Sequence, residues 1–279
     1  MSFDYGQYIR MDKMPFLWCP GCGIGIASKA LYKAFAELGW KNEDIAMVSG
    51  IGCTSRVTGY TRANTLHTTH GRALTFATGI KLACPDKHVV SMAGDGDILA
   101  IGGNHFIHAC RRNIDITVIL NNNNIYGMTG GQYSPTTPQG AFAATAPYGN
   151  VEPGFDVAKL AIAAGATYVA RGTVANGVLL ERLIRAGLAH RGFSVIEVVS
   201  NCHTQYGRRN KQPDAWQMIE DIKDRTVQVS RAEKMAPEEL IGKYVVGELH
   251  NIERPEYCDE YERMRQRALA KEAKKVVEA

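Results

Sequence analysis

Short apolar runs of strand length alternate along the chain with longer segments in which apolar residues recur every three or four positions. The short runs predict buried strands, and the longer segments predict helices with one apolar face. The expected strands are residues 45–48, 89–93, 116–120, 167–171 and 194–199. The expected helices are residues 24–38, 72–83, 99–112, 156–164 and 175–190. This alternation predicts an α/β fold, a mainly parallel sheet with helices on both faces.

The regular alternation fades after Cys202. Residues 203–250 contain only scattered segments of helix length, and residues 256–279 read as a helix rich in Glu, Lys and Arg. We therefore expect an α/β domain over residues 1–202 and a C-terminal arm over residues 203–279 that ends in the charged helix. A helix of this composition usually presents a solvated face to water, and a dedicated partner site is the alternative.

Size and composition restrict the class of protein. At 279 residues the chain can bury a sizeable core, and its 45% hydrophobic and 22% charged residues are ordinary for a globular protein. It has no apolar run long enough to cross a bilayer and no apolar segment typical of a secretory signal, so we expect a cytoplasmic protein. Its net charge of +4 is mild, and no stripe of basic and aromatic residues indicates nucleic-acid binding.

Two polar loops follow neighbouring strands of the expected sheet. Residues 94–97 read Gly-Asp-Gly-Asp, and residues 121–124 are four asparagines. Both loops lie at the carboxyl edge of the strands, so Asp95 and Asn123, 28 positions apart in sequence, can be neighbours in space. A carboxylate and an amide oxygen suit Mg²⁺, and the glycines beside Asp95 let backbone N–H groups approach a diphosphate. The pattern resembles the thiamine-diphosphate fingerprint, and a tight turn followed by a polar loop is the alternative.

Seven cysteines in a reducing compartment point to metal or redox chemistry rather than to structural disulfides. Cys19 and Cys22 form a CxxC turn, and Cys53 and Cys202 lie in loops at the same sheet edge as Asp95. Four thiolates suit either a [4Fe–4S] cluster or a structural zinc ion. A redox cluster has a mechanistic use beside thiamine diphosphate, which favours the cluster; an unrelated CxxC turn with two buried thiols is the remaining alternative. The cysteines expected to be incidental are Cys84, Cys110 and Cys258.

Six motifs in combination resemble one known family, the β subunits of 2-oxoacid:ferredoxin oxidoreductases, and most of all the two-subunit 2-oxoglutarate enzymes. The motifs, which fall between residues 15 and 205, are WCPGCG, GIGCTSR, HTTHGRALTFATGIKLA, GDGD, NNNNIYGMTGGQ and SNCH. The resemblance implies the diphosphate-binding domain of the thiamine-diphosphate-binding fold. It also implies one [4Fe–4S] cluster on the four cysteines named above, and Mg²⁺ bound by Asp95, Asn123 and the backbone carbonyl of Ile125.

The same resemblance implies the positions that contact thiamine diphosphate. These are Ile51, Gly52, Cys53, Thr54, His70, Gly94, Gly96, Asp97, Tyr126, Gly127 and Met128. Some relatives carry a Lys shortly after the NxxYG motif where this chain has Gly130, so the residue that reads the distal group of the substrate is not carried over. His203, next to Cys202, is a candidate hydrogen-bond donor to cluster sulfur.

The family's activity is the decarboxylation of a 2-oxo acid with coenzyme A as acyl acceptor. Electrons leave one at a time through the cluster to ferredoxin, and the reverse carboxylation uses the same site. Thiamine diphosphate must be activated by a carboxylate on a second α/β domain, and this chain has room for one such domain only. We therefore expect the catalytic glutamate in a partner α subunit, in an αβ or (αβ)₂ assembly.

Two other classes of function are compatible with parts of the sequence. One is a thiamine-diphosphate carboligase or decarboxylase half that performs no redox chemistry and needs no cluster. The other is a zinc-stabilised binding module in which the GDG sequence is a plain turn. The metal content separates the three classes, because only the oxidoreductase requires both iron and acid-labile sulfide.

Overall fold

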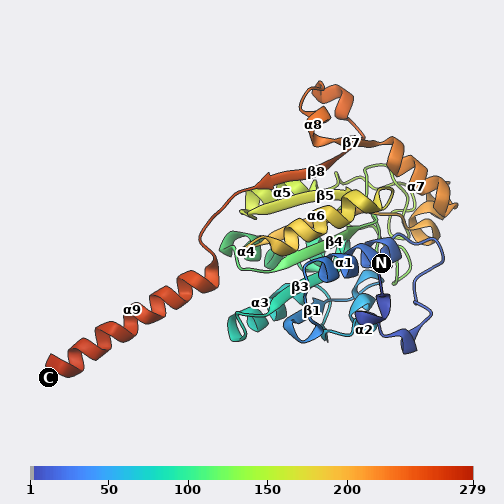
Figure 1. The fold of residues 1–279 in the computed structure, drawn as a ribbon. Helices are drawn as coiled ribbons and strands as arrows, with labels where there is room; N and C mark the ends of the chain where they lie inside the picture. Colours follow the sequence, from blue (N-terminus) through green and yellow to red (C-terminus); the bar gives the residue numbers. More distant parts are fainter. Residues whose placement is uncertain (1–2, 279) are drawn as a thin grey trace.

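Eight strands form one sheet in the computed structural model, which describes residues 3–278, and the strand order is β2-β1-β3-β4-β6-β5-β8-β7 (Figure 1). All neighbouring strands are parallel except β5 and β8, which pair antiparallel. The strands are β1 (Ile45–Ser49), β2 (Asn64–His67), β3 (His88–Gly94), β4 (Thr117–Asn122), β5 (Tyr168–Thr173), β6 (Ser194–Val199), β7 (Thr226–Gln228) and β8 (Tyr244–Asn251). This arrangement confirms the predicted α/β class with a mainly parallel sheet.

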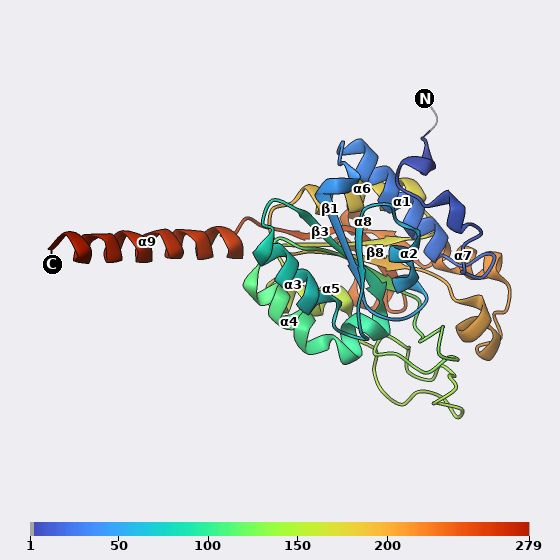
Figure 2. The same ribbon diagram turned by 90° about the horizontal axis from the view of Figure 1, so that it is seen from below.

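Helices cover both faces of the sheet, as Figures 1 and 2 show. One face carries α1 (Ile24–Glu37) and α6 (Gly177–Ala189), whose apolar residues pack together in one buried cluster. The other face carries α3 (Ala73–Ala83), α4 (Gly103–Arg112) and α5 (Val157–Ala164) in a second buried cluster. Since β4 and β6 lie between the two clusters, all of their residues are buried, which explains why their sequences read as apolar runs. The shorter or peripheral helices are α2 (Val57–Tyr60), α7 (Ala215–Asp224), α8 (Val229–Ala232) and α9 (Tyr257–Glu278).

Each expected strand and helix up to residue 199 is present, with ends shifted by a few residues, and one helix differs in kind. The helix predicted for residues 99–112 is divided into a π-helical turn, Gly96–Ile101, and the α-helix α4. The break falls at Gly102, whose N–H donates to the Asp97 carbonyl over 3.0 Å. A Cβ at position 102 would lie 2.6 Å from that same oxygen, so only glycine allows this close approach.

The strands β2, β7 and β8 were not predicted. Strand β2 is an exposed edge strand, and β8 is interrupted by Gly247 at φ +129°, so neither has a continuous apolar run. Strands β7 and β8 lie beyond residue 202 and extend the sheet past β5. The predicted boundary between an α/β domain (residues 1–202) and a C-terminal arm (residues 203–279) stays a proposal. Within the second segment, α9 is the element that projects from the body (Figure 1).

Figure 2 shows α9 running away from both helical layers. None of the helices within residues 3–278 combines the length and the apolar composition required to cross a bilayer.

Candidate functional site

Four loops meet at one edge of the sheet because β1, β3, β4 and β6 are parallel and adjacent to one another. These loops begin at Gly50, Asp95, Asn123 and Ser200, immediately after the four strands. The carboxyl edge of a parallel sheet is where ligands bind in open α/β folds. The structure therefore brings together the loops that the sequence analysis selected.

Asp95 lies at the centre of this edge and is buried, with 1% of its surface exposed. One carboxylate oxygen, Oδ2, accepts hydrogen bonds from Ser134 Oγ at 2.6 Å and from Thr136 Oγ1 at 2.5 Å. Burial raises the pKa of Asp95 to about 6, although both hydrogen bonds act in the opposite direction. Ser134 and Thr136 were not predicted, because they lie in the long loop between β4 and α5, which has no regular pattern.

Asn123 follows the neighbouring strand, and its amide oxygen is buried without a hydrogen-bond partner among the described residues. The next residue, Asn124, has a left-handed backbone with φ +61°, which turns the chain sharply after the strand. Its N–H donates to Asn122 Oδ1 over 3.2 Å, and its carbonyl accepts from Thr137 Oγ1 over 2.6 Å. The loop that holds Asn123 is thus fixed from both sides.

Asp95 and Asn123 fit a hard cation. Burial disfavours the charged form of the Asp95 carboxylate, and the Asn123 amide oxygen is buried without a hydrogen-bond donor among the described residues. A bound cation would lower the free-energy cost of burying both groups. Oxygen donors from one carboxylate, one amide and a main-chain carbonyl are typical of Mg²⁺ that also binds substrate phosphates. The buried residue Ile125 lies two positions beyond Asn123, where the sequence analysis expected the carbonyl ligand.

Asp97 has a different environment, although it belongs to the same motif. Its carboxylate accepts from the Gly71 N–H at 2.6 Å and from Ser55 Oγ at 3.3 Å, and the His70 Nε2 lies 3.5 Å away. Burial raises the pKa of Asp97, against the effect of these donors. A Cβ at Gly50 would lie 2.1 Å from Asp97 Oδ2, so this position requires glycine. Asp97 therefore connects three loops, and its predicted contact with the cofactor stays a prediction.

Tyr126 packs over the glycine turn. Its hydroxyl donates to the Gly96 carbonyl over 2.9 Å, and a Cβ at Gly96 would lie 2.4 Å from the tyrosine ring. The His70 ring meets the Tyr126 ring edge-on at 5.7 Å between centroids. Three of the predicted cofactor positions are thus in contact with one another beside Asp95. The other predicted positions, which lie on the same loops or, for Gly94, at the end of β3, are Ile51, Gly52, Thr54, Gly94, Gly127 and Met128.

The four selected cysteines line one cavity of about 210 Å³, together with Asn123, Gly127, Met128 and His203. The Thr204 hydroxyl is 3.8 Å from Cys19 Sγ and 3.7 Å from Cys202 Sγ. Burial raises the pKa of Cys22 to about 12 and that of Cys53 to about 11, with smaller contributions from neighbouring thiols.

The four thiols border the cavity without converging on a single point among the described residues. Zinc in a structural site holds four ligands around one point, with sulfur about 2.3 Å from the metal. Within residues 3–278, no three His, Cys, Asp or Glu side chains converge in a way that would hold a single ion. Four thiolates are the ligand set of a structural zinc ion and of a [4Fe–4S] cluster alike, so the cavity does not select between the two metals.

The three other cysteines lie away from this cavity. Cys110 is buried on α4, Cys84 is exposed at the end of α3, and Cys258 is buried on α9. The choice of four cysteines is therefore consistent with their positions, and ligation itself stays a prediction.

A buried polar network supports the asparagine loop and was not predicted. Asn122 Nδ2 donates to Glu197 Oε1 over 2.8 Å, and Arg171 Nε donates to Glu197 Oε2 over 2.7 Å. Arg171 also pairs with Asp156, the N-cap residue of α5, at 2.7 Å. The sequence did contain a signal: Glu197 interrupts the apolar strand Ser194–Val199, and a buried carboxylate requires a partner.

Comparisons with known proteins agree with this geometry. Residues 50–198 match the family described as thiamine pyrophosphate enzymes, C-terminal TPP-binding domain. The chain is 56% identical over 258 residues to 2-oxoglutarate synthase subunit KorB of Methanocaldococcus jannaschii. This match covers 92% of this chain and 96% of that protein. It is 48% identical over 265 residues to the subunit of the same name from Archaeoglobus fulgidus, with 95% and 96% covered.

A solved structure is also similar, the 2-oxoglutarate:ferredoxin oxidoreductase from Magnetococcus marinus with 2-oxoglutarate, coenzyme A and succinyl-CoA bound. The TM-score is 0.84 at 33% identity, and the match covers 94% of this chain and 90% of that chain. Fold and sequence therefore agree over nearly the whole chain, and the resemblance inferred from the six motifs is confirmed. The chain belongs to the family of KorB, or β, subunits of 2-oxoglutarate:ferredoxin oxidoreductases, which are thiamine pyrophosphate enzymes.

Proposed function

We propose that this β subunit holds thiamine diphosphate with Mg²⁺ and one [4Fe–4S] cluster side by side. In this role it decarboxylates 2-oxoglutarate, passes electrons to ferredoxin and yields an acyl-coenzyme A. The observation that carries the proposal is the shared lining of the cysteine cavity. Asn123, the proposed Mg²⁺ ligand, and the four cysteines border the same space of about 210 Å³.

Asp95, Asn123 and the Ile125 carbonyl would hold Mg²⁺, and the Mg²⁺ would compensate the charge of the diphosphate. The glycine turn at Gly94 and Gly96 would present backbone N–H groups to the same diphosphate. Ser134 and Thr136 donate to one Asp95 oxygen, so they keep the carboxylate oriented while its other oxygen remains available.

Thiamine diphosphate supplies the nucleophilic carbon and the electron sink when it is bound. The chain's own residues orient it: Tyr126 packs against Gly96, and Asp97 connects the loops of Gly71 and Ser55 around His70. These contacts fix the wall of the site before any ligand arrives. Preorganised polar groups of this kind lower the cost of reorganisation during the reaction.

Gly127 lies between the two sites. A Cβ at this position would lie 3.5 Å from Cys53 Sγ and 3.7 Å from Cys202 Sγ, so the loop that contains the predicted cofactor contact Tyr126 also touches two proposed cluster ligands. Such proximity suits electron transfer between the two groups. It also distinguishes the oxidoreductase from a thiamine enzyme without redox chemistry, which would have no use for the cysteine cavity.

The proposal includes the partners implied by the family. An α subunit would supply the glutamate that activates thiamine diphosphate, in an αβ or (αβ)₂ assembly, and ferredoxin would accept the electrons. Coenzyme A and a 2-oxo acid would be the substrates, and the same site would serve oxidation and carboxylation. A reducing cytoplasm would keep the four thiols available for iron.

Substitution of single cysteines tests the proposed cluster. We expect Cys53→Ser and Cys202→Ser to lose most of the iron, the acid-labile sulfide and the visible absorption, because serine is a harder ligand that binds iron poorly in such a cluster. Iron and sulfide are measured in complexes purified without oxygen. Matched controls are Cys84→Ser and Cys110→Ser, which should retain both. Loss of iron in Cys84→Ser, with retention in Cys202→Ser, would show that the four ligands are wrongly chosen.

A further inference from the structure

Helix α9 leaves the body as a single projecting rod. It spans Tyr257–Glu278, 22 residues, which corresponds to about 33 Å. Figures 1 and 2 show the body against its first turns only, with the rest of the helix extending outward in both views.

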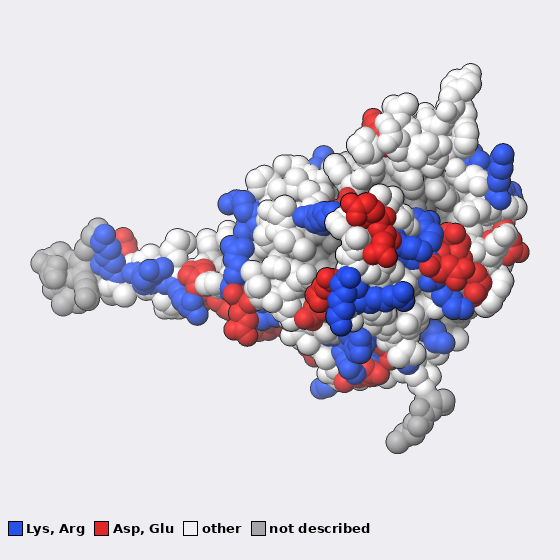
Figure 3. Space-filling model, turned by 90° about the horizontal axis from the view of Figure 1, so that it is seen from above, with Lys and Arg blue, Asp and Glu red and all other residues white. Residues whose placement is uncertain are grey.

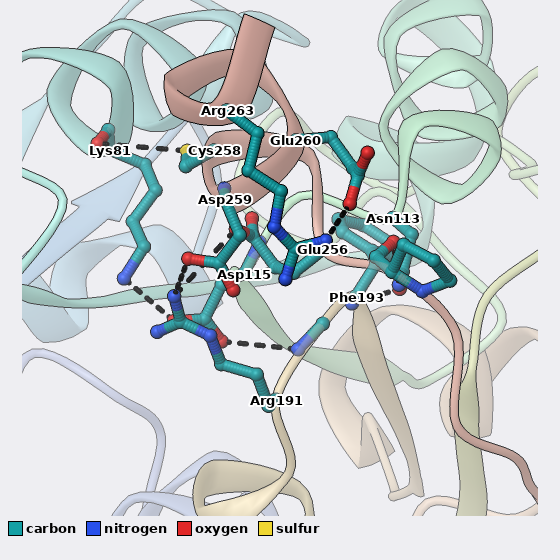
Figure 4. Close-up of polar contacts among 12 residues, drawn as sticks. Lys81, Asn113, Asp115, Arg191, Phe193, Glu256, Cys258, Asp259, Glu260 and Arg263 are labelled. Atoms are coloured by element: carbon teal, nitrogen blue, oxygen red, sulfur yellow. Dashed lines mark hydrogen bonds and ion pairs between the residues drawn. The ribbon is translucent and has the colours of Figure 1, made fainter. Parts of the chain in front are cut away.

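The base of α9 is fixed to the body by a polar network (Figure 4). The buried Glu256 accepts the Asp115 N–H at 2.8 Å through Oε1 and the Asp259 N–H at 3.0 Å through Oε2. Arg191 pairs with Asp259 at 2.6 Å, and the buried Lys81 pairs with Asp115 at 2.6 Å. Glu256 therefore caps the helix and connects its first turn to Asp115, which lies between α4 and β4, so the base of α9 is anchored to the body.

Beyond this base, α9 exposes apolar side chains. Tyr261, Met264 and Leu269 are each about half exposed, at 50%, 51% and 52%. With Ala268 they occupy positions i, i+3, i+7 and i+8, which lie on one side of a helix. Past the first turns of α9, which contact the body, this apolar stripe faces no other helix or strand in Figures 1 and 2 and so lacks the packing that stabilises most helices. The stripe is therefore a surface suited to a second helix.

The charges of α9 are segregated along its length. The first six residues contain acidic residues and no basic ones, namely Asp259, Glu260 and Glu262. Basic residues dominate from there to residue 275, namely Arg263, Arg265, Arg267, Lys271, Lys274 and Lys275. Figure 3 shows acidic atoms near the base of the helix and basic atoms farther along it. Glu260 and Glu262 pair within the helix with Arg263 and Arg265, but these ion pairs are exposed and therefore weak. The sequence is complementary to its own reverse, so two copies in antiparallel orientation would align unlike charges.

A cleft beside the base of α9 continues this complementarity. It has a volume of about 470 Å³, and it is lined by the carboxylates of Asp86, Asp115, Asp259 and Glu262. The two cations in its wall, Lys81 and Arg191, are already paired with Asp115 and Asp259. Glu262 is paired in turn with Arg265 of the same helix at 2.7 Å, so Asp86 is the one lining carboxylate without a cation partner among the described residues, and the cleft is weakly negative.

We propose that α9 pairs with α9 of a second copy of this chain, antiparallel and about a two-fold axis. The same patch serves both copies, as an isologous interface requires. Met264 lies next to the axis, Tyr261 of each helix packs against Leu269 of the other, Glu260 of each helix faces Lys271 of the other, and the two helix macrodipoles oppose each other favourably. The interface lies far from the cysteine cavity and would connect two β subunits directly.

Charge reversal with rescue tests this interface in the complete assembly. Variant one is Arg267→Glu with Lys271→Glu, and variant two is Glu260→Lys with Glu262→Lys. Each alone places like charges opposite each other and should raise the dissociation constant between copies at least tenfold. The combination of all four substitutions restores unlike charges and should recover most of the affinity. Particle mass by analytical ultracentrifugation at two salt concentrations gives the copy number, and higher salt should weaken the wild-type contact.

Two measurements keep the test decisive. Lys234→Glu with Lys243→Glu makes the same change of charge at exposed sites on the body and should leave association unchanged. Circular dichroism reports whether each variant keeps its helix content. Association that survives both single-sided reversals overturns the proposal. Loss that the four-fold combination does not rescue also overturns it, and indicates a different occupant such as the α subunit.

Discussion

Asp95 is a buried carboxylate at the candidate functional site, and burying its charge costs free energy of folding. The carboxylate is almost completely buried, and the raised pKa reports that its charge is poorly compensated despite two hydroxyl donors. Close by, Asn123 holds an amide oxygen with no donor among the described residues. A protein selected for stability alone would not keep both groups, and their presence supports the proposed Mg²⁺ site.

We expect Asp95→Asn to stabilise the cofactor-free chain while abolishing retention of thiamine diphosphate and Mg²⁺. The folded pKa of about 6 lies above the unfolded value of 3.8, so the folded wild type binds more protons between these values. Its stability therefore falls as pH rises through this window, and the neutral amide escapes that loss. The gain should be roughly 1–3 kcal/mol above pH 6 and should vanish near pH 4.

Thermal unfolding of the stripped chain at several pH values measures this gain, and cofactor content is measured on the purified complex. Asp86→Asn, at an exposed carboxylate, is the matched control and should change neither property. An Asp95→Asn protein that retains normal thiamine diphosphate would exclude Asp95 as a ligand. An Asp95→Asn chain that is less stable than wild type at pH 8 would contradict the prediction that the buried Asp95 charge destabilises the cofactor-free chain.

At the scale of elements, the asparagine loop is positioned by neighbouring strands rather than by its own sequence. Asn122 on β4, Glu197 on β6 and Arg171 on β5 form a continuous chain of hydrogen bonds across three adjacent strands. The Asn122 amide oxygen then accepts the Asn124 N–H and so sets the turn that contains Asn123. Displacing this chain of contacts should move a proposed metal ligand without removing it.

We expect Glu197→Gln to weaken binding of Mg²⁺ and thiamine diphosphate by roughly 10–100-fold, the range found for residues that orient metal ligands. Stability should also fall, because Arg171 loses a buried partner. Asp156→Asn changes the other acidic partner of Arg171, which caps α5 and has no hydrogen bond to Asn122, and is the matched control. It should lower stability but leave cofactor affinity within a few-fold of wild type. Affinity measured by titration and stability by denaturant unfolding separate the two effects, and equal affinity losses in both variants would reject the positioning role.

The sequence predicted the strands that are buried on both faces of the sheet. It also predicted the loops that are rich in polar and thiol side chains. It did not predict Ser134 or Glu197 as supports of the site, because each acts through a contact between segments far apart in sequence. Strand β8 was missed for a related reason: it is half-buried, and a glycine interrupts its alternation. Local patterns report burial and turns, whereas the support of a site depends on three-dimensional contacts.

At the scale of the whole molecule, the polar and thiol side chains of the candidate site gather at the carboxyl edge of the sheet. Helix α9 projects from a separate part of the body (Figure 1). The family comparisons place the chain among subunits of larger enzymes. Thiamine diphosphate bound at the edge would expose its aminopyrimidine to whatever chain covers the site. Activation from a second chain would explain why the proposed diphosphate site and the proposed cluster need a partner subunit for catalysis.

We therefore expect the isolated chain to be inactive even when loaded. After reconstitution with thiamine diphosphate, Mg²⁺, iron and sulfide, it should neither decarboxylate 2-oxoglutarate nor reduce its own cluster, because we expect the activating carboxylate on the α subunit. Addition of that subunit should restore both reactions, with coenzyme A required only for full turnover. Release of CO₂ and bleaching of the cluster absorption measure the two reactions, and iron content shows that the isolated chain is loaded. Rapid bleaching of the lone chain by 2-oxoglutarate would place the activating group within these 279 residues and would refute the division of labour between the subunits.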